Sequence, residues 1–240
     1  MTPSEKVKYI SNWIKAYADQ MPSRAEALVI GISGGIDSSV SSTLSAMTGL
    51  KTIALSMPIK QKENQHDLSL KHQEWLVKNF KNAEAHTISL DKLFESFSST
   101  LSKFDNEHGF ANSRARLRMA TLYQVAAANK GIVVGTGNKV EDFGVGFYTK
   151  YGDGGVDISP IADCNKSDVW KLGKELGILK EIIDAPPTDG LWDDGRTDEG
   201  QLGFKYSELE DAMGNPNSPH REQYEKIRNQ NLHKMEPIPV

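Results

Sequence analysis

The stretch LVIGISGGIDSS, Leu28 to Ser39, decides how this chain folds. Its first residues form an apolar run of the kind found in buried strands, and the run leads into a short loop that contains three glycines. Asp37 and the two serines that follow it then open a segment with helical spacing. Glycines let a backbone turn sharply and approach a ligand, and the first turn of a helix offers unpaired amide donors to an anion. The stretch therefore predicts a strand, a phosphate-binding loop and a helix start.

Asp37 distinguishes this loop from the common nucleotide triphosphate loop, in which a lysine precedes the serine or threonine. A carboxylate beside bound phosphate is repulsive unless a cation lies between them, so Asp37 predicts a magnesium ion. The hydroxyl groups of Ser33, Ser38 and Ser39 are expected to add donors to the phosphate cradle. The loop resembles the SGGxDS loop of the ATP pyrophosphatase superfamily, whose members split ATP between the α and β phosphates and transfer AMP to a substrate oxygen.

The composition is that of a globular protein long enough for one α/β domain. The chain has 240 residues, of which 38% are hydrophobic and 25% charged, and its formal net charge of -4 argues against a nucleic-acid partner. The single cysteine, Cys164, excludes an internal disulfide framework and a multi-thiolate metal site. The N-terminus lacks the apolar core of a signal peptide, and no stretch approaches the roughly 20 apolar residues of a membrane span. We therefore expect a cytoplasmic protein with no membrane partner.

Strand-like and helix-like segments alternate along the chain. Beyond the opening strand, short apolar runs predict strands at 52–57, 85–89 and 131–135. Helices are predicted at 40–47, 68–80, 90–101, 111–129, 167–179, 206–213 and 219–229, and Thr2 or Ser4 is expected to cap another at the N-terminus. This alternation predicts a single Rossmann-like α/β domain of three layers, with a mostly parallel sheet and helices on both faces. Ligands then lie beyond the carboxyl ends of the strands, where the SGGIDSS loop sits.

Two irregular segments border the expected crevice, and each has two interpretations. The polar segment IKQKENQHD, Ile59 to Asp67, is either a solvated loop or a flap over the nucleotide. The segment APPTDGLWDDGRTDEGQLG, Ala185 to Gly203, is rich in proline, glycine and aspartate and is either a linker or a mobile lid.

The predicted helix 111–129 carries three arginines in its first turns. Arg114, Arg116 and Arg118 are spread around the helix by their alternate spacing, so one or two are expected in structural ion pairs and at least one is suited to a phosphate. The spacing alone does not select among them. The apolar face of this helix is expected to run through Leu117, Ala120, Val125 and Ala128.

The segment TGNKVEDFGVGFYTKYGDGGVDISP, Thr136 to Pro160, follows the last predicted strand and is dense in polar groups. Thr136 is expected at the carboxyl end of that strand, beside the nucleotide. Glu141 is a second acid near the same end, and two carboxylates around one magnesium ion suit a triphosphate. Flexible backbone in the glycine-rich part can bring further charged groups close to a ligand, namely Lys150, Asp153 and Asp157.

Joined with SGGIDSS, this segment resembles the ammonia-dependent NAD synthetase family, and the match in order and spacing extends over 28–237. The SGGxDS loop marks the superfamily, whereas FYTKYGDGGVD marks this branch of it. One departure is that VEDFGVGF carries one more residue between Glu141 and the TKYGDGG block than some members have, which leaves Asp142 as a competing acid. A second is that Met235 follows Lys234 in the tail, where a common ending is HKR.

The resemblance implies individual site residues. The implied ATP site comprises Gly31, Ile32, Ser33, Gly34, Gly35, Ile36, Asp37, Ser38, Thr136, Lys166 and Thr188. The implied magnesium ligands are Asp37 and Glu141. The implied deamido-NAD site comprises Arg116, Lys150, Asp157, His233 and Lys234. The implied catalytic residues are Asp153, which would orient ammonia or accept a proton from ammonium, and Lys166, which would neutralise phosphate oxygens.

The resemblance also implies the reaction, which is ATP-dependent amidation of deamido-NAD with ammonia through an acyl adenylate, the last step of NAD biosynthesis. It implies a homodimer and one NAD synthetase domain over 1–240, with a nucleotide-binding core at 28–160, a mobile lid at 185–205 and C-terminal helices and tail at 206–240. Ammonia is expected as the nitrogen donor because a glutaminase domain does not fit in this length. The alternatives are another AMP-forming ligase of the superfamily and a non-catalytic ATP-binding regulator, which would require an impaired magnesium site.

Overall fold

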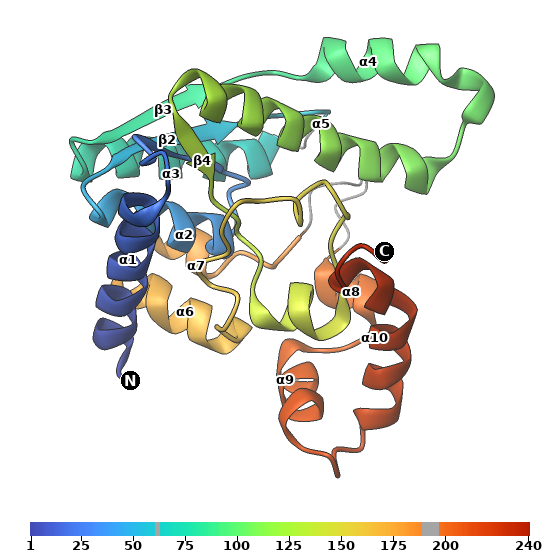
Figure 1. The fold of residues 1–240 in the computed structure, drawn as a ribbon. Helices are drawn as coiled ribbons and strands as arrows, with labels where there is room; N and C mark the ends of the chain where they lie inside the picture. The colour runs from blue at the N-terminus through green and yellow to red at the C-terminus, as the bar shows by residue number, and fades with distance from the viewer. Residues whose placement is uncertain (61–62, 189–196) are drawn as a thin grey trace.

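A four-stranded parallel sheet forms the centre of the computed structural model, which describes residues 1–60, 63–188 and 197–240 (Figure 1). The strands are β1 (Ala27–Gly31), β2 (Lys51–Ser56), β3 (Ala83–Thr87) and β4 (Gly131–Val133), in the order β3-β2-β1-β4. β1 pairs in parallel with both neighbours, so that Ala27 lies opposite Lys51 on one side and Gly131 on the other. A Cβ atom at position 131 would lie 2.6 Å from the carbonyl oxygen of Ala27, so this close pairing requires glycine.

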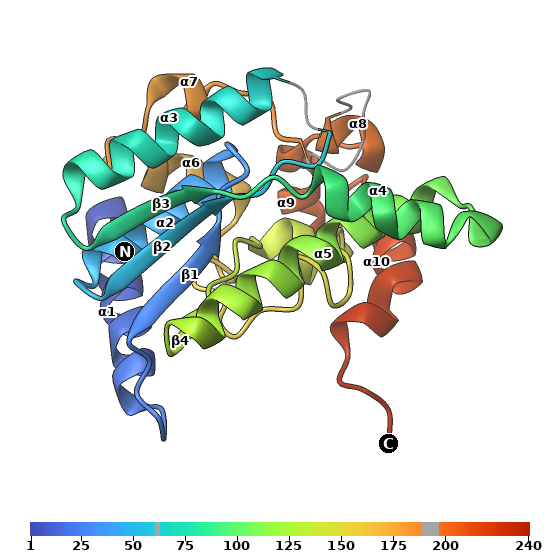
Figure 2. The ribbon, with the colours of Figure 1, turned by 90° about the horizontal axis from the view of Figure 1, so that it is seen from above.

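Successive side chains of β1 enter two different hydrophobic cores, as the period of a strand requires. Leu28 and Ile30 pack in one core, and Ala27 and Val29 pack in the other. The helices that share the first core are α1 (Pro3–Gln20), α2 (Ile36–Met47), α3 (Glu63–Asn79), α6 (Lys166–Glu175) and α7 (Lys180–Ile183). The second core is covered by α4 (Asp91–Thr100) and α5 (Glu107–Ala128), which are joined through the short helix η1 (Ser102–Phe104). Figure 2 shows the sheet lying between α3 and α5.

A third, smaller core joins the C-terminal helices to the segment that follows β4. Its elements are η2 (Lys139–Val145), α9 (Tyr206–Gly214) and α10 (Arg221–Met235), and the short helix α8 (Asp198–Leu202) precedes them in this part of the chain. In Figure 1, α9 and α10 project from the body of the three-layered domain. Val140 and Val145 of η2 are fully buried in this core, so the C-terminal helices hold η2 in place beside the sheet.

The predicted fold class is confirmed, because the sheet is parallel and helices cover both of its faces. Among the described residues, no helix is both long enough and apolar enough to span a membrane. The predicted N-terminal cap is also correct: the Thr2 side chain accepts a hydrogen bond from the backbone N–H of Glu5, and the Glu5 side chain accepts one from Thr2.

The predicted apolar face of α5 is only half correct: Leu117 and Val125 pack against the second core, but the other two residues do not. Of the four residues expected on that face, Ala120 and Ala128 are exposed. The buried face runs instead through Ala111, Ala115, Met119, Leu122 and Ala126. Alanines and other apolar residues occur around most of the circumference of α5, so periodicity permitted more than one face.

Several predicted boundaries change, three of them because polar helices lack a strong apolar period. Residues 63–67, expected within an irregular segment, form the first turn of α3, whereas 61–62 lie outside the described residues. Residues 198–202, expected as irregular, form α8. The last helix reaches Met235, so His233 and Lys234 are helical and do not belong to an extended tail.

Candidate functional site

The carboxyl edge of the sheet opens into a cavity of about 620 Å³, which is large enough for a nucleotide. β1 ends at Gly31 and β4 ends at Val133, and the residues that follow both strands line the cavity. Met57, Met119 and Leu122 contribute an apolar wall, while the SGGIDSS loop and several acids contribute polar groups. The cavity therefore lies where a parallel sheet places its ligands.

The SGGIDSS loop is braced by its own hydroxyl groups. Gly34 has a φ of 89°, in the left-handed region that favours glycine. Gly35 is the N-cap of α2 and has no side chain to cap the helix. The amides of the first turn are therefore open to an anion. Ser38 and Ser39 both donate to the carbonyl oxygen of Gly35, at 3.0 and 2.9 Å. Ser33 and Ser38 line the cavity, but Ser39 is fully buried behind the loop, so the expectation that Ser39 belongs to the phosphate cradle is wrong.

One buried lysine joins two carboxylates at the floor of the cavity. Lys166 begins α6, and its side chain is only 1% exposed. Its Nζ lies 2.5 Å from Oδ2 of Asp37 and 2.9 Å from Oε1 of Glu141. The fold thus brings together α2, η2 and α6. The positive charge of the lysine ammonium lies between the two carboxylates and holds them close to each other.

The charges of this cluster depend on one another. Burial acts to raise the pKa of Asp37 and outweighs the attraction of Lys166, so the pKa of Asp37 is raised. Burial opposes ionisation of Glu141 as well, but Lys166 and the hydrogen bonds of Tyr206 and Lys166 prevail, and the pKa of Glu141 is lowered. Burial alone would lower the pKa of Lys166, yet the two carboxylates outweigh it and raise that pKa. Lys166 is therefore a permanent cation at neutral pH.

Asn138 is a site residue that the sequence did not single out. It is fully buried, and its Nδ2 donates to Oδ1 of Asp37 at 3.1 Å. Its Oδ1 accepts hydrogen bonds from the backbone N–H groups of Val140 and Glu141, so it caps η2 and links the two acids. The available signal was an asparagine directly before a new helical segment, which is typical of an N-cap.

Tyr206 of α9 is a second residue that was missed. Its hydroxyl donates to Oε1 of Glu141 at 2.5 Å, and its side chain is buried. Burial and the negative charge of Glu141 raise the pKa of Tyr206. It lies 65 residues from Glu141 along the chain, and no local motif marks it.

The segment VEDFGVGF, which carries one more residue than some family members have, overlaps a π-helix. η2 is a π-helical turn, a rare conformation that is frequent at functional sites. Asp142 packs directly on Gly137, where a Cβ atom would lie 1.8 Å from Oδ2 of Asp142. Burial, and then the charges of Asp153 and Glu141, raise the pKa of Asp142 well above its usual value. Because Asp142 and Glu141 both line the cavity, Asp142 remains a competing acid.

The implied nucleotide and metal residues come together around this one cavity. Every residue implied for ATP lines it, namely Gly31, Ile32, Ser33, Gly34, Gly35, Ile36, Asp37, Ser38, Thr136, Lys166 and Thr188. Glu141 and Asp153 line it as well. The central part of the expected lid, residues 189–196, lies outside the described residues, but 185–188 and 197–198 on either side of it also line the cavity.

The implied dinucleotide residues lie elsewhere. Arg116 Nε donates to the carbonyl oxygen of Lys150 at 3.2 Å, and Lys150 Nζ donates to the carbonyl oxygen of His233 at 3.1 Å. Lys234 lies beside them on α10, with its Nζ donating to the carbonyl oxygen of Tyr148. These groups form a basic cluster, and none of them is among the described residues that line the cavity.

Asp157 is separate from that basic cluster. Its Oδ1 accepts a hydrogen bond from the hydroxyl of Tyr123 at 3.0 Å, and its Oδ2 accepts one from the backbone N–H of Val133 at 2.7 Å. Both contacts fasten the loop to β4 and α5. Burial, and then the charge of Asp157, raise the pKa of Tyr123 to about 12, so Tyr123 remains a donor.

The three arginines of α5 point to different places. The Arg114 guanidinium lies 4.9 Å from the centre of the Phe94 ring. Arg116 is exposed, whereas Arg118 lines the cavity and its Nε donates to the carbonyl oxygen of Met57 at 3.0 Å. The arginine that lines the cavity is therefore Arg118, whereas Arg116, which the resemblance implies for the deamido-NAD site, lies outside it.

The donors in the cavity fit magnesium. Asp37 and Glu141 provide carboxylate oxygens, which hard cations prefer, and both already accept hydrogen bonds from the Lys166 ammonium. In the described part of the chain, no group of three or more His, Cys, Asp or Glu side chains converges as a complete metal site. Asp37 and Glu141 alone would leave coordination positions open, which phosphate oxygens of a nucleotide would suit.

Comparison with known proteins gives consistent matches. The sequence profile of the family described as NAD synthase matches residues 6–237. The chain is 34% identical to an NH(3)-dependent NAD(+) synthetase from Carboxydothermus hydrogenoformans, over 86% of this chain and 83% of that protein. A solved NMN synthetase from Francisella tularensis superposes with a TM-score of 0.91 at 36% identity and covers 100% of this chain and 98% of its own. An NH3-dependent NAD synthetase from Campylobacter jejuni has the same fold, with a TM-score of 0.80, 23% identity, and coverage of 100% and 99%.

Proposed function

Because the chain belongs to the NAD synthase family, we propose that it is an AMP-forming ligase that amidates deamido-NAD with ammonia. The observation that carries this proposal is the single cavity that joins the SGGIDSS loop to the cluster of Asp37, Glu141 and Lys166. A glycine-rich loop with open helix amides suits a polyphosphate, and an acid pair beside it suits the cation that accompanies ATP. The reaction is the last step of NAD biosynthesis.

The first step activates the nicotinate carboxylate. A carboxylate oxygen attacks the α-phosphorus of ATP, the bond between the α-phosphorus and the bridging oxygen breaks, and pyrophosphate leaves with that electron pair. The amides of the loop hold the departing phosphates, and Lys166 neutralises their oxygens. Asp37 and Glu141 would hold a magnesium ion, which would further stabilise the charge that develops on pyrophosphate.

The second step replaces AMP by ammonia. Nitrogen attacks the acyl carbon of the adenylate, the bond to the AMP oxygen breaks, and a proton leaves the nitrogen to give the neutral amide. We assign Asp153 to orient ammonia or to accept a proton from ammonium, because it lines the cavity and accepts a hydrogen bond from the backbone N–H of Thr149 at 3.0 Å. Asp142 lies close enough to influence its charge.

The remaining assignments follow the family. We propose that ATP occupies the cavity and that the basic cluster of Arg116, Lys150, His233 and Lys234 contributes to binding deamido-NAD, with Asp157 supporting the loop between them. We further propose that the chain acts as a homodimer in the cytoplasm, that 28–160 form the nucleotide-binding core, and that 185–205 act as a lid that joins this core to the C-terminal helices at 206–240.

A second candidate acceptor is nicotinate mononucleotide, which would give NMN. The solved structure with a TM-score of 0.91 is named NMN synthetase, and its 36% identity is in the same range as that of the NAD synthetase from Carboxydothermus. Both acceptors present the same nicotinate carboxylate, so the two chemical steps are unchanged. The basic cluster outside the cavity is the region where the acceptors would differ, since the dinucleotide has an additional adenosine monophosphate half.

The test is product formation by the purified protein with ATP, Mg²⁺ and ammonium, in parallel with deamido-NAD, with nicotinate mononucleotide and without acceptor. We expect equal amounts of AMP, pyrophosphate and NAD with deamido-NAD, and loss of all three in Asp37→Ala. The exposed acid Asp163 provides the matched control, and Asp163→Ala should retain activity. A higher kcat/KM for nicotinate mononucleotide than for deamido-NAD would select the second candidate. Release of pyrophosphate in the absence of both acceptors would refute both proposed functions.

The role of Asp153 needs its own comparison. Asp153→Asn should reduce NAD formation more than pyrophosphate release, because the first step does not require proton removal from the nitrogen donor. Equal loss of both products would exclude that role for Asp153.

A further inference from the structure

Tyr206 contacts three charged groups of the site from behind the cavity. Its hydroxyl oxygen lies 2.5 Å from Oε1 of Glu141 and 3.2 Å from Oδ2 of Asp198. The face of its ring lies under the Lys166 ammonium, with Nζ 4.9 Å from the ring centre. The edge-to-face contact with Trp170, at 6.0 Å between ring centres and an interplanar angle of 89°, holds the ring in place. Tyr206 is 2% exposed, so its orientation is set by these neighbours.

The hydroxyl of Tyr206 has one proton and faces two carboxylates. It can donate to Glu141 or to Asp198 at one moment, and the shorter distance assigns the proton to Glu141. The Lys166 ammonium and the Tyr206 hydroxyl both bond to the same oxygen, Oε1. Oε1 of Glu141 is therefore held from two sides, by the ammonium and by the hydroxyl.

Asp198 connects this contact to the segment beyond the cavity. Asp198 begins α8, is 5% exposed, and donates its backbone N–H to the carbonyl oxygen of Pro187 at 3.1 Å. The backbone N–H of Tyr206 donates in turn to Oε1 of Glu199 at 2.9 Å. This bond to Glu199 joins the start of α9 to the start of α8, and Asp198 itself lines the cavity.

We propose that Tyr206 is a positioning residue for the metal ligand Glu141, and that its hydroxyl couples Glu141 to Asp198 at the start of α8. The proposal rests on the proposed function, in which Glu141 binds magnesium. The hydroxyl holds Oε1 and so fixes the orientation of the Glu141 carboxylate. The competing carboxylate of Asp198 makes the strength of that hold depend on where α8 lies.

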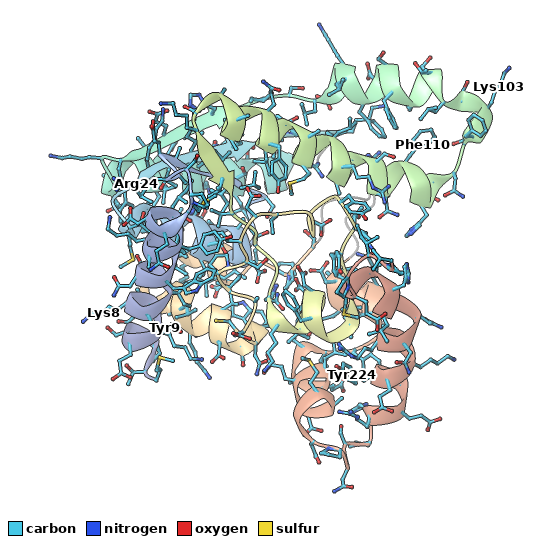
Figure 3. The ribbon with its side chains drawn as sticks, viewed as in Figure 1. Lys8, Tyr9, Arg24, Lys103, Phe110 and Tyr224 are labelled. Atoms are coloured by element: carbon cyan, nitrogen blue, oxygen red, sulfur yellow. The ribbon has the colours of Figure 1, made fainter. Side chains whose placement is uncertain are left out.

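Removal of the hydroxyl alone isolates this role. Tyr206→Phe keeps the ring under Lys166 and against Trp170 and deletes only the two contacts to carboxylates. Tyr224 offers the matched control, because it is a buried tyrosine of the same small core, and its hydroxyl contacts a backbone carbonyl, that of Gly144. Figure 3 shows Tyr224 on α10, on the side that faces α9.

The experiment measures binding of Mn²⁺ as the metal probe, with ATP present, from the electron paramagnetic resonance signal of the free ion. Loss of a hydrogen bond to a ligating carboxylate typically weakens metal binding by about tenfold to a hundredfold. We expect that loss for Tyr206→Phe, with the thermal midpoint close to that of Tyr224→Phe, and Mn²⁺ affinity unchanged in Tyr224→Phe. Equal Mn²⁺ affinity in Tyr206→Phe and the wild-type protein would overturn the proposal.

The coupling to Asp198 has a separate readout. If the hydroxyl of Tyr206 transmits the effect of Asp198 to Glu141, Asp198→Asn should change the Mn²⁺ affinity of the wild-type protein but not that of Tyr206→Phe. The effects of the two substitutions on Mn²⁺ affinity are then non-additive in the double variant. Additive effects would overturn the coupling. Failure of the proposed function would look different, because the wild-type protein itself would then form no NAD from deamido-NAD.

Discussion

Replacement of Lys166 by methionine tests whether the buried cluster is held by one ammonium. Lys166→Met keeps an unbranched apolar side chain of similar length but removes the charge that lies 2.5 Å from Asp37 and 2.9 Å from Glu141. The lysine is 1% exposed and the two acids are 17% and 14% exposed, so water does little to replace the lost contacts. Removing one partner of a buried ion pair typically costs about 3 to 5 kcal/mol. For a chain of this length that corresponds to a decrease in Tm of roughly 6 to 20 °C.

The assay is urea unfolding of the ligand-free protein at pH 7.5 and at pH 5. Without Lys166, burial and mutual repulsion raise the pKa values of Asp37 and Glu141 above those of the unfolded chain. The folded variant then binds more protons than the unfolded chain, so its stability rises relative to the wild-type protein as the pH falls. The difference in unfolding free energy should therefore be smaller at pH 5 than at pH 7.5.

The control is Lys171→Met on the same helix. Lys171 is 64% exposed and lies 4.0 Å from Asp168, so this variant should change the unfolding free energy by less than about 0.5 kcal/mol. The reasoning would be refuted by a deficit below about 1 kcal/mol in Lys166→Met, or by a deficit that grows as the pH falls.

Two further predictions concern packing and pH. Gly137→Ala should destabilise the protein by about 1 to 3 kcal/mol, because its Cβ would lie 1.8 Å from Oδ2 of Asp142. The control, Gly214→Ala, places its Cβ where no atom lies within 4 Å, so it should be neutral or slightly stabilising in the same thermal melt. Equal effects of the two substitutions on stability would contradict this prediction. His72 is buried beside the hydroxyl of Ser42 at 2.8 Å, and burial lowers its pKa from 6.5 to about 4. The unfolded chain therefore takes up the proton first, and about 3 kcal/mol of stability should be lost as the pH falls from 6.5 to 4. Measured by urea unfolding, His72→Gln should show a shallower pH dependence than the wild-type protein, and identical slopes would refute the assignment.

The sequence was sufficient for the parts of the site that follow strand ends. A buried run that leads into a glycine-rich turn specifies both the strand and the loop, and parallel strands then bring separate loops to one edge of the sheet. This is why the sequence predicts that the SGGIDSS loop, Thr136 and Glu141 lie beside one another. The alternation of strands and helices specified the layers in the same way.

The sequence was insufficient where a contact depends on how separate layers pack. Tyr206 reaches Glu141 only because α9 packs on η2 in the small third core, and nothing local in the sequence encodes that distance. Half of the predicted apolar face of α5 is incorrect because an alanine-rich helix is apolar on more than one side. Arg118 lines the cavity because α5 packs on β1 and β4 and brings this side chain to Met57, just beyond the end of β2, and that packing cannot be read from the spacing of the arginines.

The most direct test of the account follows the oxygen atoms of the acceptor carboxylate. Deamido-NAD carrying ¹⁸O at both carboxylate oxygens is incubated with the protein, ATP, Mg²⁺ and ammonium, and the products are examined by mass spectrometry. If the carboxylate attacks the α-phosphorus, each AMP acquires one ¹⁸O atom, the new amide retains the other, and pyrophosphate carries none. Unlabelled AMP, or label in a phosphate that leaves as pyrophosphate or inorganic phosphate, would contradict the acyl adenylate and with it the role assigned to the cavity.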